Sequence, residues 1–216
     1  MKLGILFSGR GSNLGALIDA CADPDYPAEI VIAICNNPDA SGIATAEKAG
    51  IPLQIINHRE FESRDTFDAA LDVTLKEAGV ELVCNAGFMR ILTDGFVSSW
   101  HNRQLSIHPS LLPAFKGLHV HERVLTAGVR ISGASVHFVR AEMDEGPIIA
   151  QVAIPVELDD TPESLAERVL ACEHGLYPMA VRLVAEGKAR VQGERVIIEG
   201  DPDMKAAPLF IPPLRK

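Results

Sequence analysis

The sequence predicts an α/β fold with a mostly parallel, twisted central sheet that is flanked by helices on both faces. Short continuous apolar runs, such as 3–7 and 80–84, are typical of strands buried on both faces of a parallel sheet. Amphipathic stretches of helical period separate these runs at the spacing of βαβ units. Gly79 and Gly187 follow two of these stretches, where a glycine commonly ends a helix.

Length and composition restrict the class of protein. With 216 residues, of which 47% are hydrophobic and 23% charged, the chain can bury a large core. Its formal net charge of −9 argues against a nucleic-acid partner. No apolar run has transmembrane length and no signal peptide is indicated, so we expect a cytoplasmic protein without a membrane partner. The sequence leaves open whether it is a monomer or a homodimer.

Metal and disulfide chemistry are not expected. The four cysteines are widely spaced and form no C-x-x-C pair, which argues against a zinc site or a disulfide framework. His119 and His121 have a spacing seen in metal sites, but no third ligand cluster of matching character is near them in the sequence. The prediction is therefore no metal.

The first half of the chain alternates strands and helices. We expect strands at 3–7, 30–35, 53–56 and 80–84. We expect helices at 14–22, 41–50, 61–78 and 93–99.

The second half continues the sheet, with strands expected at 104–108, 131–139 and 148–156. A long helix begins with Thr161 as its cap and Pro162 in its first turn. A small hairpin at 190–198 and a proline-rich tail follow it. We therefore predict one α/β domain over 1–188, with a hairpin and tail at 189–216 packed on the same domain.

The turn after the first strand indicates an anion site. Gly11, Ser12 and Asn13 stand between the strand and a helix, where free backbone N–H groups and the helix dipole favour negative charge. The dinucleotide fingerprint is not matched, because Leu14 occupies the place of its third glycine. A phosphate-bearing substrate is favoured over a nicotinamide cofactor. The alternative is a glycine turn that only connects two elements.

Candidate acid–base residues lie at the carboxyl end of the predicted sheet. Ser106 and His108 project to one face of a strand that stops at Pro109. His108 is a candidate general base or electrophile, with Asp144 from an acidic loop as its carboxylate. His137 is a second strand histidine that could face the cleft. The alternative for His108 is a structural histidine at the start of a loop. No nucleophile stands out, so direct transfer is favoured.

Two further groups are candidates for ligand contacts. The apolar segment 88–92 includes Arg90 and suits a planar ligand with an acidic tail, or else it is core. Glu173 lies just off the apolar stripe of the long helix. It would reach the hydroxyls of a ligand or else face solvent.

Six motifs together resemble those of the phosphoribosylglycinamide formyltransferases, the folate-dependent formyltransferases of purine synthesis. They are SGRGSNL, AGFMRIL, IHPSLLP, KGLH, SVHFV and MDEGPI, at residues 8–14, 86–92, 107–113, 116–119, 135–139 and 143–148. The resemblance runs from Lys2 to about Gly187. It implies a Rossmann-like formyltransferase fold that transfers a formyl group from 10-formyltetrahydrofolate to the amine of glycinamide ribonucleotide in de novo purine (IMP) biosynthesis. The transfer would pass through a tetrahedral oxyanion, without a metal.

The resemblance also implies residue roles. Ser106, His108 and Asp144 fall at catalytic positions, where His108 would stabilise the oxyanion and Asp144 would tune the histidine and relay protons through water. The ribonucleotide would be held by Gly11, Ser12, Asn13 and Glu173. The folate would be held by Arg64, Met89, Arg90, Ile91, Leu92, Val139, Arg140 and Glu142.

One position departs from the family pattern. The family has asparagine two residues before the catalytic histidine, where this chain has Ser106. Losing one oxyanion donor costs on the order of a hundred- to a thousand-fold in turnover. Ser106 is therefore disabling, acts through a water, or is replaced by another group. We hypothesise that Asn85, at the end of a neighbouring strand, supplies the missing carboxamide.

Two other functions stay open. Formyltetrahydrofolate deformylase uses the same core with water as the acceptor, but it usually carries an amino-terminal regulatory domain, and this chain starts at its first strand. A catalytically weakened homologue that only binds nucleotide or folate is the other alternative, because of Ser106.

Overall fold

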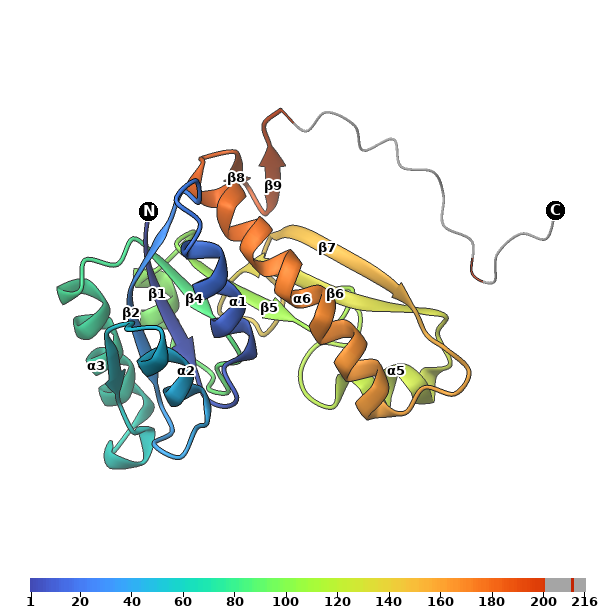
Figure 1. Cartoon of the computed structure of the whole chain (residues 1–216), viewed down its shortest axis with the longest axis horizontal. Coiled ribbons are helices and arrows are strands. Elements are labelled where there is room, and N and C mark those ends of the chain that lie inside the picture. The colour runs from blue at the N-terminus through green and yellow to red at the C-terminus, as the bar shows by residue number, and fades with distance from the viewer. Residues whose placement is uncertain (201–210, 212–216) are drawn as a thin grey trace.

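A computed structural model describes residues 1–200 and 211 of the chain (Figure 1). Apart from residue 211, the proline-rich tail lies outside the described residues. The central sheet has seven strands in the order β3-β2-β1-β4-β5-β6-β7. Their bounds are β1 Lys2–Phe7, β2 Glu29–Cys35, β3 Leu53–Ile55, β4 Leu82–Asn85, β5 Gln104–His108, β6 Ile131–Phe138 and β7 Ile148–Pro155.

The sheet is mostly parallel, as the sequence predicts. Strands β1 to β5 pair in parallel, whereas β6 and β7 are antiparallel to their neighbours. The carboxyl ends of β1, β4 and β5 therefore meet at one edge, which is where ligands bind in open α/β sheets.

Helices cover both faces of this sheet (Figure 1). Their bounds are α1 Ser12–Cys21, α2 Gly42–Lys48, α3 Arg64–Glu77, α4 Asp94–Ser99, α5 Val120–Ala127 and α6 Pro162–Ala185. Helix α6 contacts α1 and α5 on one face, and these elements enclose the larger apolar core. Helices α3 and α4 enclose a second core on the other face. Alternate residues of β1 feed the two cores, with Ile5 in the first and Leu6 in the second.

Two predicted helix starts are wrong for local reasons. The helix predicted at 61–78 begins at Arg64, because Ser63 and Thr66 form a capping box around its first turn. A short 3-10 helix, η1 His58–Glu60, precedes it. The helix predicted from Leu14 begins two residues earlier, at the end of the turn that contains Gly11. Apolar periodicity marks the buried face of a helix but not its N-cap, which is the polar Ser63 in α3 and the left-handed Gly11 in α1.

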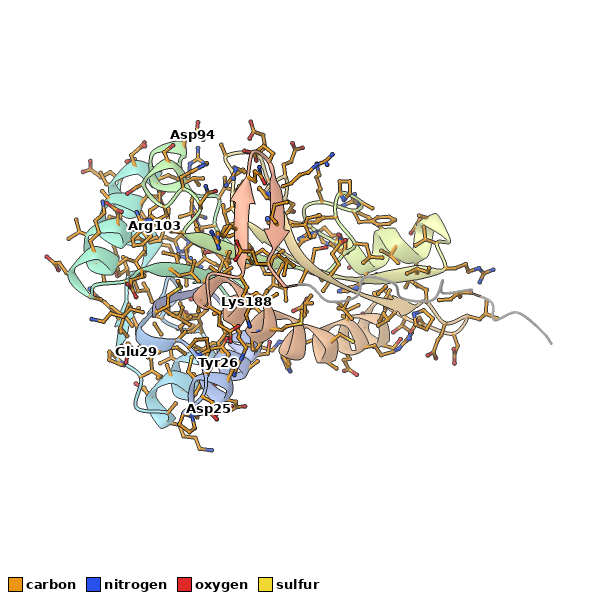
Figure 2. The ribbon with its side chains drawn as sticks, turned by 90° about the horizontal axis from the view of Figure 1, so that it is seen from above. Asp25, Tyr26, Glu29, Asp94, Arg103 and Lys188 are labelled. Carbon is orange, nitrogen blue, oxygen red and sulfur yellow. The ribbon has the colours of Figure 1, made fainter. Side chains whose placement is uncertain are left out.

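The C-terminal hairpin consists of β8 Ala189–Gln192 and β9 Arg195–Ile198. Figure 2 labels Lys188 at its base, where the chain leaves α6. Apolar side chains of both strands pack against the larger core, and Glu194 pairs with Arg140 at 3.0 Å. These contacts tie the hairpin to the sheet. The domain boundary at residue 188 stays a prediction.

Gly11→Ala should destabilise the fold by more than the left-handed backbone alone requires. Gly11 has φ +70°, which costs alanine about 1–2 kcal/mol. A Cβ there would also lie 2.9 Å from the Cα of Gly42, so the backbone would have to separate. Urea unfolding measures the loss.

Gly50→Ala is the matched control. Its φ is +67°, but no heavy atom outside its chain neighbours lies within 4 Å of the added Cβ. Only the backbone cost should remain. Equal losses for the two variants would contradict a packing role for Gly11.

Candidate active site

The candidate site follows one row of the sheet. Asn85, the last residue of β4, is the register partner of Ser106 in β5. Ser106 is in turn the partner of His137 in β6. Register partners share a face, and His108 lies two residues beyond Ser106 on the same face. The prediction that the strands of Asn85 and His108 are neighbours is confirmed.

His108 is held at both ring nitrogens. Its Nδ1 lies 3.4 Å from Oδ2 of Asp144, and its Nε2 lies 3.0 Å from the carbonyl oxygen of Phe115. The residue is buried. Two acceptors on opposite sides of the ring fix its orientation, as a residue that transfers protons requires.

Asp144 joins the loop after β6 to both histidines. The backbone N–H of Gly117 donates to its Oδ2 at 2.8 Å, the oxygen that also faces His108. Its Oδ1 lies 3.8 Å from Nε2 of His137. Asp144 has φ 56°, a left-handed conformation that aspartate tolerates better than most residues. The strained backbone is held in place by the contacts of its carboxylate.

His137 is a buried neutral base. Because the carbonyl of Phe138 can only accept, Nδ1 of His137 carries the proton in their 3.0 Å contact. Burial is the main cause that lowers the pKa of His137, which keeps the ring neutral near pH 7. The lone pair on Nε2 faces Asp144 and has no hydrogen-bond partner in the described part of the chain.

The loop after His108 is fastened to the antiparallel edge of the sheet. The hydroxyl of Ser135 donates to the carbonyl of Ser110 at 2.7 Å and accepts from the N–H of Leu112 at 3.0 Å. Gln151 donates to Ser135 and to the carbonyl of Leu112. These buried bonds hold the segment that carries the Phe115 carbonyl.

The predicted anion turn lies on the face covered by α1 and α6. Gly11 is the N-cap of α1, and no acidic residue lies in the first turn of that helix. Asn13 in this turn donates from Nδ2 to Oε2 of Glu173 at 2.7 Å. Both side chains are buried, which corrects the expectation that Glu173 lies off the buried stripe of α6. Burial raises the pKa of Glu173, while the Asn13 contact opposes this.

Two arginines meet in a cavity on the other face. Arg64 of α3 and Arg90 of the loop after β4 line a cavity of about 210 Å³. Phe61 and Phe67 supply apolar walls to it. Paired guanidinium groups suit carboxylates, because each offers a planar fork of donors.

Metal ligation and membrane spanning have no structural support in residues 1–200 and 211. No group of three or more histidine, cysteine, aspartate or glutamate side chains gathers there as metal ligands do. No helix of the described part is long and apolar enough to cross a membrane. That the reaction needs no metal stays a prediction.

Comparison with known proteins decides the family. Residues 1–181 match the formyl transferase family. The chain belongs to the formyl transferase family. The phosphoribosylglycinamide formyltransferase of Escherichia coli is 38% identical over 200 residues, which are 93% of this chain and 94% of that protein. The crystal structure of glycinamide ribonucleotide transformylase 1 from Symbiobacterium toebii superposes with a TM-score of 0.90 at 45% identity, covering 92% of this chain and 93% of that one.

A second kind of relative is much longer. The trifunctional purine biosynthetic protein adenosine-3 of Bos taurus is 50% identical over 190 residues, which are 88% of this chain and 19% of that protein. The formyl transferase chain thus spans about a fifth of the length of that relative. The predicted resemblance and the predicted α/β fold are both confirmed by these matches.

The segment predicted to wall a folate is divided between surface and core. Met89 and Ile91 are 70% and 57% exposed, so they are available to a ligand. Leu92 is buried in the second core, which is the alternative that the sequence left open. The N–H of Met89 donates to the hydroxyl of Ser8 at 2.7 Å, which ties this segment to the turn after β1.

The loop predicted to contact the pterin has three different environments. Glu142 is exposed, and Val139 packs against the second core. Arg140 donates to Glu194, to the side chain of Asn102 and to the carbonyl of Val139. Its guanidinium therefore fastens the loop to the hairpin, and its role toward a ligand stays a prediction.

Sequence reasoning missed two groups that touch the site. Gln104 donates from Nε2 to Oδ1 of Asn85 at 3.2 Å. Strand alternation could have found it, since Gln104 is two residues before Ser106 and shares its face. The Phe115 carbonyl could not have been found, because it depends on the path of a loop with φ 53° at that residue.

Glu173→Gln should stabilise the fold at pH 8, because burial disfavours the charged carboxylate there. The glutamine oxygen can still accept from Asn13. A raised folded-state pKa means that the folded state binds a proton more tightly, so the stability of the parent falls as pH rises through that range. The advantage of the variant should shrink as pH falls toward about 4.3, the pKa of an unfolded glutamate. Urea unfolding between pH 5 and 8 measures it.

Glu186→Gln at the C-cap of the same helix is the matched control. The contact with Lys188 lowers the pKa of Glu186, so removal of this carboxylate should give no gain at pH 8. Stabilisation by Glu186→Gln with a loss for Glu173→Gln would contradict the assignment of a costly buried charge to Glu173.

Proposed function

We propose that this formyl transferase moves a formyl group from 10-formyltetrahydrofolate to the amine of glycinamide ribonucleotide, a step of de novo purine (IMP) biosynthesis. The observation that carries the proposal is the position of His108. His108 ends β5, a parallel neighbour of β4, which is itself paired with β1, and these two strands lead into the segments that carry Arg90 and Asn13. Two substrates held by these segments would meet beside its ring.

The ribonucleotide side is supported by the helix end and the buried carboxylate. The first backbone N–H groups of α1, from Ser12 onward, have no partner within the helix and favour a phosphate. Glu173 accepts from Asn13 through one oxygen, and its other oxygen suits a hydroxyl or amine of the ligand. The names of relatives in Escherichia coli and Bos taurus agree with this substrate class.

The folate side is supported by the cavity lined by Arg64 and Arg90. Two guanidinium groups beside two phenylalanine rings fit a ligand with an aromatic body and carboxylates at one end. The folate acts as a cosubstrate that carries an activated formyl group. Met89 and Ile91 would cover its apolar surface, in keeping with their exposure.

The chemistry assigned to His108 and Asp144 follows from proton balance. The amine nitrogen forms a bond to the formyl carbon, and the bond from that carbon to the folate nitrogen breaks. The amine must lose a proton and the folate nitrogen must gain one. His108 would donate to the oxygen that becomes negative once its Nε2 leaves the Phe115 carbonyl, while Asp144 orients the ring and passes protons through water.

The proposed reaction is compatible with the location, oligomeric state and partners expected from the sequence. The protein would act in the cytoplasm as a monomer or homodimer, on small molecules and without a nucleic-acid partner. Formyltetrahydrofolate deformylase activity would use the same His108–Asp144 pair with water as the acceptor. An assay with and without glycinamide ribonucleotide therefore distinguishes the two activities.

We expect formyl transfer that depends on glycinamide ribonucleotide. His108→Gln should lower kcat by about a hundred- to ten-thousand-fold, because it removes the acid–base group. Release of tetrahydrofolate, measured with and without the ribonucleotide, tests both statements. Release at the same rate without the amine would support deformylase activity instead.

His101→Gln is the matched control, since His101 is exposed and makes no side-chain hydrogen bond in the described part. It should keep the kcat of the parent. Similar losses in the two histidine variants would contradict the proposed role of His108.

A further inference from the structure

We propose that Asn85, held in position by Gln104, donates the carboxamide N–H that stabilises the oxyanion of the formyl group. This inference rests on the proposed function, because it names the donor for that reaction. It assigns Asn85 as a catalytic residue and Gln104 as a positioning residue.

Most donors around His108 are already used by protein acceptors. An oxyanion site needs N–H or O–H groups that the protein has not already used. Both ring nitrogens of His108 face protein acceptors, at Asp144 and at the Phe115 carbonyl. The N–H of His137 is used by the carbonyl of Phe138. Two other donors of this row, Nδ2 of Asn85 and the hydroxyl of Ser106, make no hydrogen bond among residues 1–200 and 211, and Asn85 uses only its Oδ1.

The Asn85 amide and the Ser106 hydroxyl differ in how firmly they are oriented. The oxygen of the Asn85 amide accepts from Gln104, and both side chains are buried. Because an amide is planar, a fixed oxygen also fixes the direction of the two N–H bonds. The Ser106 hydroxyl has no such partner and rotates freely. A donor that is already oriented stabilises developing charge without reorganisation, so Asn85 is the better candidate.

The end of β4, which carries Asn85, is held by a buried tyrosine. The buried hydroxyl of Tyr177 in α6 lies 3.1 Å from the carbonyl of Asn85 and 3.3 Å from the carbonyl of Leu105. Tyr177 is fully buried. One side chain thus joins the last residue of β4 to the second residue of β5 from the opposite face of the sheet. Tyr177 therefore holds the backbone carbonyl of Asn85, and Gln104 holds its side-chain oxygen.

The row from Asn85 to His137 spans three neighbouring strands, with Ser106 in the middle. Asn85 and His137 stand on either side of Ser106, so they are separated by two strand spacings, which is about 10 Å. Serine is the smallest hydroxyl side chain, so it fills less space above the middle strand than the asparagine of the family pattern would. We place the carbonyl oxygen of the formyl group above Ser106, between the strands of Asn85 and His137. Ser106 therefore makes room for a donor that comes from the neighbouring strand.

Asn85 takes part in the transfer only as a hydrogen-bond donor. The amine lone pair forms the new bond to the formyl carbon, and the carbonyl π electrons move onto oxygen. The Asn85 N–H donates to that oxygen and keeps its own proton. When the carbonyl re-forms, the old bond from carbon to the folate nitrogen breaks, and its electron pair is protonated there. Asn85 and Gln104 are unchanged at the end.

The test uses the full chain with 10-formyltetrahydrofolate and glycinamide ribonucleotide. Asn85→Leu should lower kcat by about a hundred- to a thousand-fold with little change in either KM, because an oxyanion donor acts mainly in the transition state. Asn85→Asp is the second variant, since it keeps the shape and can still accept from Gln104 but has no N–H. It should lose kcat to a similar extent even where Asn85→Leu folds poorly.

A double-mutant cycle tests the positioning role of Gln104. Gln104→Leu should lower kcat by about ten-fold, and the combination of Asn85→Leu with Gln104→Leu should be no slower than Asn85→Leu alone. Gln192→Leu on exposed β8 is the matched control and should keep the parent kcat. Independent, multiplied losses at Asn85 and Gln104 would overturn the claim that Gln104 acts through Asn85.

The competing explanation is that Ser106, and not Asn85, donates to the oxyanion. In the Asn85→Leu background, Ser106→Asn should restore kcat at least ten-fold, because it returns a carboxamide to the same row. A parent that turns over only with the amine, together with an unchanged kcat in Asn85→Leu and Asn85→Asp and a large loss in Ser106→Ala, would overturn the inference and leave the proposed function intact. A parent without ribonucleotide-dependent turnover would overturn both.

Discussion

The register between β4, β5 and β6 is the constraint on which the site depends. Apolar residues on the opposite face, among them Leu82, Cys84 and Leu105, are buried in the larger core and fix this register. A slip of one residue would turn Asn85 and Ser106 toward that core. The polar row therefore exists because the other face of the same strands is apolar. Packing energy on one side of the sheet sets the geometry of the chemistry on the other.

The electrostatics of the site follow from partial burial. Asp144 accepts from the backbone N–H of Gly117 and lies 3.4 Å from Nδ1 of His108, so the one carboxylate joins two segments of the chain, while the unprotonated Nε2 of His137 lies 3.8 Å from its other oxygen. A buried polar atom without a partner costs roughly 1–3 kcal/mol. Asn13, Gln104 and His137 each contain such an atom in the part of the chain that is described. Asn13 lies in the turn assigned to the ribonucleotide, and Gln104 and His137 share a sheet face with Ser106, whereas Asn36, His121 and Ser132 contain the other such atoms of the described residues.

Much of this arrangement could be predicted from local patterns. Strand alternation predicts Ser106 and His108 on one face of a strand, and β5 confirms this. The glycine turn predicts a helix after Gly11, which is confirmed, although α1 begins at Ser12 and not at Leu14. Contacts between distant segments could not be predicted. Glu173 is buried against Asn13, which lies 160 residues earlier, and Arg140 is engaged by Glu194, which lies 54 residues later. Helical periodicity alone could not reveal either contact, because each depends on how separate elements pack.

The most direct measurement is a crystal structure of the parent chain with a bound analogue of the tetrahedral adduct of ribonucleotide and folate. Asn85 should then place its Nδ2 within about 2.7–3.1 Å of the oxygen that represents the oxyanion, while its own oxygen still accepts from Gln104. The Asn13–Glu173 pair should contact the ribonucleotide half, and Arg64 and Arg90 should contact the folate half. An Asn85 amide turned away from that oxygen, with Ser106 donating in its place, would contradict the mechanism.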